Sequence, residues 1–284
     1  MEMEDKVIKL EKISNNVRKK IIEMIYDAGS GHPGGSLSCV EILVSLYKEA
    51  MDITLDENGK RIDKFVLSKG HAAPAYYAVL SECGFIPKKD LNTLRKYDSY
   101  LEGHPSNKIP GVDVSSGSLG QGLSIANGMA LEKKVFNKKG NVYCLLGDGE
   151  IEEGQIWEAF MSAHKYELSN LIVFLDYNGL QIDGTNIEVK KLDNIKEKVD
   201  AFGFNVQTID GHNIYEILQA INNAKSSLKP NFIIAKTIKG KGISFMENQV
   251  SWHGKSLKNE EYIKAMKELG GSIWNQQEKR MVNF

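Results

Sequence analysis

Short apolar runs that alternate with longer helical patterns are the feature of this sequence that most constrains its fold. Five segments have the composition of strands: 63–71, 141–149, 170–178, 204–209 and 231–238. The second and third of these runs are apolar at nearly every position, which is typical of parallel strands covered on both faces. Helical patterns, such as the one at 214–227, alternate with the runs. We therefore predict an α/β fold with a mostly parallel sheet and helices on both faces.

The chain shows no internal division. Its 284 residues are 42% hydrophobic and 26% charged, the balance of an ordinary globular protein with a sizeable core. No internal repeat, low-complexity segment or linker rich in Pro, Gly and Ser interrupts it. We expect one domain over residues 1–284, with a core at about 10–256 and a charged helical tail at about 257–284.

Charge and cysteine content exclude several function classes. The 36 basic and 37 acidic side chains give a formal net charge of −1, so nothing indicates binding to nucleic acid. The apolar runs are too short to span a bilayer, and the charged N-terminus has no signal-peptide core. The three cysteines, Cys39, Cys83 and Cys144, form no CxxC pair, which favours a reducing compartment. We expect a cytoplasmic protein without a membrane partner.

An acid and an amide stand at the ends of two neighbouring runs. Asp148 follows the apolar residues of 141–149, and Asn178 ends 170–178. Because ligands bind beyond the carboxyl ends of parallel strands, we expect both at one rim of the sheet. Their oxygens suit Mg²⁺, and Gly149 lets the backbone approach a ligand closely. The alternative is structural: Asp148 caps the next helix and Asn178 makes a turn with Gly179.

The stretches "GDGEIEEGQIWEA" and "NLIVFLDYNGLQIDG" resemble the thiamine-diphosphate signature of the transketolase family. The resemblance implies the thiamine-diphosphate-binding fold, in its diphosphate-binding domain. It also implies that the side chains of Asp148 and Asn178 and the main-chain oxygen of Leu180 bind Mg²⁺. The ion then holds the diphosphate of the cofactor, with Gly149 among the cofactor-binding residues.

The segment 27–38, "DAGSGHPGGSLS", contains a G-x-G-x-x-G pattern at Gly29, Gly31 and Gly34. A dinucleotide-binding fingerprint should follow a strand, whereas this pattern follows a long helical one and includes Pro33. We therefore reject that interpretation. The same stretch resembles the "GHPG" segment of transketolases, which implies that His32 lies at the substrate.

Two further stretches match the family. In "SKGHAAPAYYAVL", His71 stands where a strand gives way to a helix, a position that is often only a surface or cap residue. Helix N-termini also attract phosphate, and the resemblance makes His71 a diphosphate contact. In "LEGHPSNKIPGVDVSSGSLGQG", the resemblance places His104 at the hydroxyl groups of the donor sugar. It also places cofactor contacts at three consecutive residues, Gly117, Ser118 and Leu119, although the family often has proline at the second of these.

The remaining candidates are His253 and Glu153. The family has a histidine-glycine pair where "SWHGKSL" stands, which implies both diphosphate contact and proton transfer for His253. Glu153 matches a glutamate that links two active sites through a subunit interface, although acidic residues are favourable at any helix start. His164 and His212 have no match in the family, and we interpret both as structural.

The resemblance implies a reaction that needs a second chain. A two-carbon ketol unit would pass from a ketose to an aldose through a thiamine-diphosphate carbanion, with His32, His104 and His253 moving protons. The match covers only the first third to half of a transketolase. We expect a partner that supplies the pyrimidine-binding and C-terminal domains of a split transketolase, in a two-plus-two heterotetramer that acts on sugar phosphates.

Several alternatives stay open at this point. A ketol transferase for sulfonated or branched sugars would share these motifs, and so would an enzyme resembling deoxyxylulose-phosphate synthase. A non-catalytic thiamine-diphosphate-binding module is a third possibility, against which the set of histidines argues. The chain could also be a truncated piece of a longer enzyme.

Overall fold

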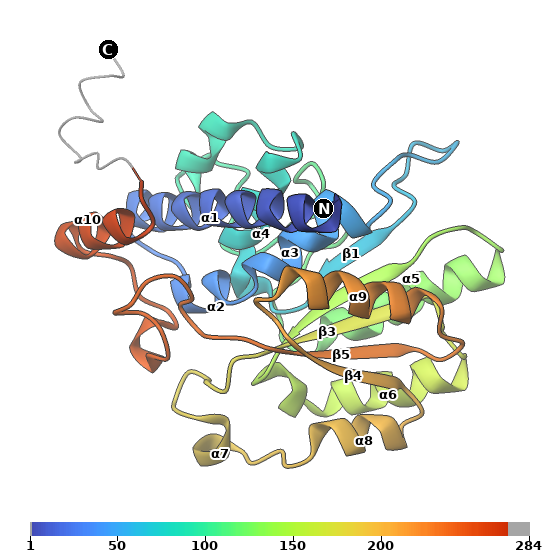
Figure 1. The fold of residues 1–284 in the computed structure, drawn as a ribbon. Coiled ribbons are helices and arrows are strands. Elements are labelled where there is room, and N and C mark those ends of the chain that lie inside the picture. The colour runs from blue at the N-terminus through green and yellow to red at the C-terminus, as the bar shows by residue number, and fades with distance from the viewer. Residues whose placement is uncertain (1, 272–284) are drawn as a thin grey trace.

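A five-stranded sheet forms the centre of the computed structural model, which describes residues 2–271 (Figure 1). Its strands are β1 Lys64–Leu67, β2 Val142–Gly147, β3 Leu171–Tyr177, β4 Asn205–Asp210 and β5 Asn231–Lys236. They lie in the order β1-β2-β3-β5-β4, and every neighbouring pair is parallel. The five predicted strands are confirmed, and the sheet is parallel throughout.

Successive residues of β1, β2, β3 and β5 point into two different hydrophobic cores. On β2, Tyr143 and Leu145 join the core on one face of the sheet, whereas Cys144 and Leu146 join the core on the other. Alternation along a strand sends neighbouring side chains to opposite faces. Both faces are covered, so every position of β2 is buried, which explains why its sequence has no polar alternation.

Helices form a layer on each side of the sheet (Figure 1). The first layer contains α1 Glu2–Ala28, α3 Val40–Ser45, α4 Ala73–Glu82 and α9 Ile214–Lys225, and the second contains α5 Gln121–Val135, α6 Gly154–Lys165 and α8 Ile195–Ala201. α10 Asn259–Glu268 packs on α1, where the rings of Tyr26 and Tyr262 stack with centroids 4.1 Å apart. Within residues 2–271, none of the helices is both long and apolar enough to cross a membrane.

Short helical turns account for the differences from the predicted elements. The glycine-rich break after α1 contains α2 Pro33–Leu37, which Pro33 can begin because a first-turn residue needs no N–H bond. Other elements of this kind are α7 Asn186–Val189, a π-helical turn Leu46–Ala50, and 3₁₀ turns Gly70–Ala72, Lys88–Thr93, Glu150–Glu152 and Val250–Trp252. Such turns are too brief for a helical period to show in the sequence. Of the expected charged tail, α10 is described, and 272–284 lie outside the described residues.

The aromatic core beneath α6 provides a test of the packing. Phe160 is fully buried, and its ring centroid lies 5.0 Å from that of Phe204 and 5.5 Å from that of Phe232. We expect Phe160→Ala to lower the free energy of unfolding by about 3–5 kcal/mol, because it leaves a cavity among rigid rings. Urea denaturation followed by circular dichroism measures this change. The neighbouring Met161 is 55% exposed, so equal losses for Phe160→Ala and Met161→Ala would contradict the packing described here.

Candidate functional site

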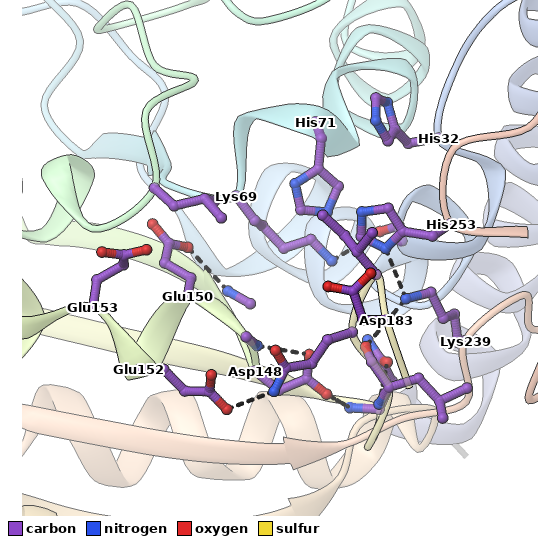
Figure 2. Close-up of a pocket in the computed structure, with 18 of the residues that line it drawn as sticks. His32, Lys69, His71, Asp148, Glu150, Glu152, Glu153, Asp183, Lys239 and His253 are labelled. Atoms are coloured by element: carbon purple, nitrogen blue, oxygen red, sulfur yellow. Dashed lines mark hydrogen bonds between the residues drawn. The ribbon is translucent and has the colours of Figure 1, made fainter. Parts of the chain in front are cut away.

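A cavity of about 430 Å³, the main cavity, lies where β1, β2, β3 and β5 end. Its lining includes four histidines (His32, His71, His104 and His253), five acids (Asp148, Glu150, Glu152, Glu153 and Asp183) and three lysines (Lys69, Lys190 and Lys239). Figure 2 shows His32, His71 and His253 gathered on one side and Glu150, Glu152 and Glu153 on the other. The cavity therefore combines proton-transfer groups with charges of both signs.

Three of the predicted histidines form a compact triangle. The centroids of the His32 and His71 rings lie 5.4 Å apart, those of His32 and His253 5.6 Å, and those of His71 and His253 5.3 Å. They come from three separate chain segments: the residue before α2, the turn after β1 and the end of the turn Val250–Trp252. Packing between distant segments, rather than sequence spacing, brings the rings together.

His104 approaches the cavity from the loop before α5. Its main-chain oxygen accepts a hydrogen bond from Tyr77 Oη at 2.9 Å, which holds the loop against α4. A Cβ atom added to Gly117 would lie 3.2 Å from Cγ of the His104 ring. Glycine at position 117 therefore gives the ring its space beside the loop of expected cofactor contacts.

The histidines of the triangle are held in the neutral form. Burial, followed by the charges of nearby groups, lowers the pKa of His32 to about 4 and that of His253 to about 3. The pKa of His71 is lowered well below its usual value, first by burial and then by Lys69. Near neutral pH each ring therefore keeps a nitrogen lone pair that can accept a hydrogen bond. Within residues 2–271, the buried Nδ1 of His32 has no hydrogen-bond partner, so a polar group of a ligand would satisfy it.

The oxygen atoms expected to hold a metal lie together at the rim. Asp148 Oδ2 accepts hydrogen bonds from the backbone N–H groups of Asn178 at 3.1 Å and Gly179 at 2.7 Å, and from Asn186 Nδ2 at 3.2 Å. Oδ1 accepts one from the adjacent Gly149 N. The Asn178 side-chain oxygen accepts a bond from Leu180 N at 3.2 Å. The loop after β3 is thus tied directly to the acid after β2.

The charge of Asp148 lacks full compensation in this arrangement. The side chain is 5% exposed, and burial together with Asp176 raises the pKa of Asp148 above its usual value. A bound divalent cation would remove this penalty. The described residues contain no cluster of three or more His, Cys, Asp or Glu side chains able to hold a metal, so a metal here would rely on amide and carbonyl oxygens. That donor set suits Mg²⁺.

Two buried lysines bring positive charge to the cavity, and sequence reasoning missed both. Lys239 Nζ donates to the main-chain oxygen of Leu180 at 3.1 Å and contacts His253 Nδ1 at 2.9 Å. Burial lowers the pKa of Lys239 to about 8. Lys69 forms an ion pair with Asp176 that is almost fully buried, and it donates to the Gly35 carbonyl at 2.9 Å. Burial opposes the charge of Lys69, but Asp176 outweighs it and raises the pKa of the lysine.

Glu150 is a further residue that the sequence did not reveal. It is 2% exposed, and its carboxylate accepts bonds from Ser68 Oγ, from Gly120 N at 2.9 Å and from Gly147 N at 3.1 Å. These donors belong to the segments after β1, before α5 and at the end of β2. Glu150 therefore joins the three loops that surround the cavity.

The other expected site residues lie at different depths. Gly117, Leu119 and Gly149 line the main cavity, whereas Ser118 is exposed and lines a shallow neighbouring hollow. Glu153 lines the cavity, is exposed, and precedes α6. Neither His164 nor His212 is among the residues that line the main cavity.

Comparison with known proteins gives a consistent picture. The family model described as "Transketolase, thiamine diphosphate binding domain" matches residues 10–282. One subunit of the apulose-4-phosphate transketolase of Phocaeicola vulgatus is 39% identical over 266 residues, covering 93% of this chain and 95% of its own. The 6-deoxy-6-sulfo-D-fructose transketolase subunit SqwG of a Clostridium species is 43% identical over 270 residues, covering 94% and 98%.

Longer proteins match over a part of their length. Human transketolase is 44% identical over 257 residues, which are 89% of this chain but 41% of the human protein. The crystal structure of transketolase from Campylobacter jejuni superimposes with a TM-score of 0.86 at 34% identity, covering 95% of this chain and 45% of that one. The chain thus spans less than half the length of these transketolases.

The lowered pKa values lead to a prediction about stability and pH. His32 and His253 titrate at about 4 and about 3 in the folded protein but near 6.5 when unfolded. At pH values between the folded-state and unfolded-state pKa values, the unfolded chain binds more protons than the folded chain, so acidification favours unfolding. We expect the melting temperature to fall between about pH 7 and about pH 4.5, and to fall less in His253→Gln than in the wild type. Differential scanning calorimetry at both pH values measures this; an equal or steeper fall in the variant would contradict the neutral state of His253.

Proposed function

The chain belongs to the transketolase family through its thiamine diphosphate-binding domain, and from this premise we propose that it is the N-terminal subunit of a two-chain transketolase. It would act as one diphosphate-binding domain in the transfer of a two-carbon ketol unit from a ketose to an aldose. The observation that carries this proposal is one cavity that holds both the oxygen ligands at the ends of β2 and β3 and the histidine triangle.

We propose that Asp148, Asn178 and Leu180 hold Mg²⁺, which in turn anchors the diphosphate of thiamine diphosphate. Asp148 Oδ1 is the less occupied oxygen of its carboxylate, and a carbonyl oxygen such as that of Leu180 has two lone pairs. The main-chain groups at Gly117 and Leu119, together with His71, complete the cofactor site. Thiamine diphosphate supplies the nucleophilic carbon and the electron sink that carbon–carbon bond cleavage requires.

The histidines are proposed to handle the protons of the sugar. His32 and His253 are neutral near pH 7, so a ring nitrogen of each can accept a hydrogen bond from the hydroxyl group whose proton is to be moved. His104, on the more exposed side, is proposed to face the hydroxyl groups of the donor. Lys69 and Lys239 add positive charge that favours anionic groups in the same space.

A second polypeptide is proposed to complete the active site. Two relatives that match this chain over 95% and 98% of their own length carry names of transketolase subunits. Full-length transketolases are more than twice as long as the matched part. The partner would supply the pyrimidine-binding and C-terminal domains in a two-plus-two heterotetramer. Glu153, exposed at the cavity rim, is proposed to face that partner, and the assembly is proposed to be cytoplasmic.

The names of the relatives favour an unusual sugar as a second candidate substrate. One relative is named for apulose 4-phosphate and another for a sulfonated fructose. Ketol transfer from such branched or sulfonated sugars would use the same cavity. An enzyme resembling deoxyxylulose-phosphate synthase finds less support, because the relatives compared above carry transketolase names.

The metal assignment gives a direct binding experiment. We expect Asp148→Ala to weaken Mg²⁺-dependent binding of thiamine diphosphate by roughly 100-fold or more, since it removes the charged ligand of the ion. Isothermal titration calorimetry with thiamine diphosphate in excess Mg²⁺ measures the affinity. Asp183→Ala is the matched control, because Asp183 lines the same cavity but is exposed. Unchanged affinity in Asp148→Ala would overturn the assignment.

The partner assignment predicts a strict dependence of turnover on a second chain. We expect this chain alone, saturated with Mg²⁺ and thiamine diphosphate, to show no ketol transfer. Addition of a polypeptide from the same organism that carries the remaining transketolase domains should restore transfer and form a stoichiometric complex by size-exclusion chromatography with light scattering. Full activity of the isolated chain, or an active mixture without a complex, would contradict the proposal.

A further inference from the structure

A buried hydrogen-bond chain lies behind the loop that carries Lys239 into the cavity. His212, in the turn after β4, accepts a hydrogen bond at Nε2 from the backbone N–H of Ile238, at 2.9 Å. Its Nδ1 lies 2.9 Å from Glu41 Oε2 on α3. Glu41 in turn accepts a bond from Arg18 Nη2 on α1 at 2.8 Å. The chain of bonds thus runs from α1 through α3 to the turn after β4, and it ends at the residue before Lys239.

The bonding pattern fixes the state of the His212 ring. Because the N–H of Ile238 is a donor, Nε2 of the ring must be unprotonated to accept from it. The ring proton then resides on Nδ1 and faces the carboxylate of Glu41. Glu41 and Arg18 are each 7% exposed. Burial works against the charge of Glu41, but the bonds from His212 and Arg18 lower its pKa below the usual value.

The same loop is held at other points, which together define its path. Arg18 Nε donates to the Lys241 carbonyl at 3.0 Å. Thr237 N donates to Tyr177 O at 3.0 Å, and Gly240 N donates to Gly34 O at 3.0 Å. The loop therefore follows the end of β3 on one side and the first turn of α2 on the other. The carbonyl of Lys239 itself accepts a bond from Asn248 N at 2.9 Å, and the bond from Ile238 to His212 holds the preceding residue from a side chain.

The position of the Lys239 ammonium depends on this loop. A lysine side chain has four rotatable bonds, so its charge is placed well only when the backbone is fixed. In this structure Lys239 is 2% exposed and reaches both Leu180 O and His253 Nδ1. These two atoms belong to the expected metal site and to the histidine triangle. A small shift of residue 238 would move the ammonium away from both.

We propose that His212 is a positioning residue: held by Glu41 and Arg18, it fixes the loop so that Lys239 presents its ammonium to a metal-bound diphosphate. The inference rests on the proposed function, because the diphosphate is that of thiamine diphosphate. His212 itself does not line the cavity. No motif in the sequence distinguishes His212 from His164. In the structure, His212 is connected to the cavity through Ile238, the residue before Lys239.

Two variants, His212→Gln and His212→Asn, distinguish the proposed positioning role of His212 from a general effect on stability. The glutamine amide extends to about the place of Nε2 and can accept from Ile238, whereas the asparagine amide ends near Nδ1 and cannot reach it. In His212→Asn the N–H of Ile238 loses this acceptor, so the segment around residue 238 is free to move toward another one and carry Lys239 with it. We expect His212→Asn to weaken Mg²⁺-dependent binding of thiamine diphosphate by about tenfold or more and His212→Gln by less than about threefold.

His164→Asn is the matched control, because His164 is an exposed histidine on α6 that does not line the cavity. It should bind the cofactor as the wild type does. Calorimetric titration with Mg²⁺ and thiamine diphosphate measures each affinity, and melting temperatures show whether each variant is folded. If His212→Asn does not fold, Glu41→Gln replaces it, since loss of the carboxylate charge frees the ring to take the other tautomer and should also weaken binding.

A double-mutant comparison shows whether the effect passes through Lys239. In the Lys239→Met background, we expect His212→Asn to change affinity by less than about twofold, because the charge that it positions is already absent. The inference is overturned if His212→Asn binds the cofactor like the wild type, or if His212→Gln weakens binding as much as His212→Asn does. It is also overturned if His212→Asn causes the same loss of affinity in the Lys239→Met background as in the wild type. Failure of the wild type to bind the cofactor would instead refute the proposed function.

Discussion

The parallel pairing of β2 with β3 is the constraint on which the site depends. It sets Gly147 opposite Asp176, so the residues that follow the two strands emerge at one edge of the sheet. Asp148 then lies close enough to accept hydrogen bonds from the backbone of Asn178 and Gly179. Strands that end at the same edge supply the rim from which ligands are bound in parallel α/β sheets. The proximity of Asp148 and Asn178, the proposed oxygen ligands, is therefore a consequence of strand order.

Burial of charge is the second property that organises the cavity. Asp176 lies beneath it with donors from Lys69, Ser38 and Thr237, so its negative charge is fully bonded. Removal of one partner from such a buried pair leaves an uncompensated charge and is strongly destabilising. Within residues 2–271, the hydrogen bonds to Asp148 come from backbone N–H and amide donors rather than from a paired cation, and the histidines of the triangle are kept neutral. A buried carboxylate beside two lysines fits a cation and an anionic group bound together, such as the metal-bound diphosphate that we propose.

The sequence predicted the strands and the rim, but not the groups that support them. Four of the strands were recognisable as apolar runs because both of their faces are buried, whereas β4, at the edge of the sheet, is only partly buried. Asp148 and Asn178 were found because they follow two of the buried strands. The same rule, applied to lysine, would have pointed to Lys69 and Lys239, which also follow strand ends. Glu150 and His212 could not be found in this way. Their roles come from contacts with residues up to 171 positions away in the sequence. The residues next to them in the sequence do not indicate such long-range contacts.

The central claim is that a metal ion at the ends of β2 and β3 anchors the cofactor. The most direct measurement is a crystal structure of the chain with thiamine diphosphate and Mn²⁺ in place of Mg²⁺, because anomalous scattering locates the manganese without reference to any assumed site. We expect one strong anomalous peak among Asp148, Asn178 and the carbonyl of Leu180, with the diphosphate beside it. A peak elsewhere, or a bound cofactor whose diphosphate lies away from these residues, would contradict the claim.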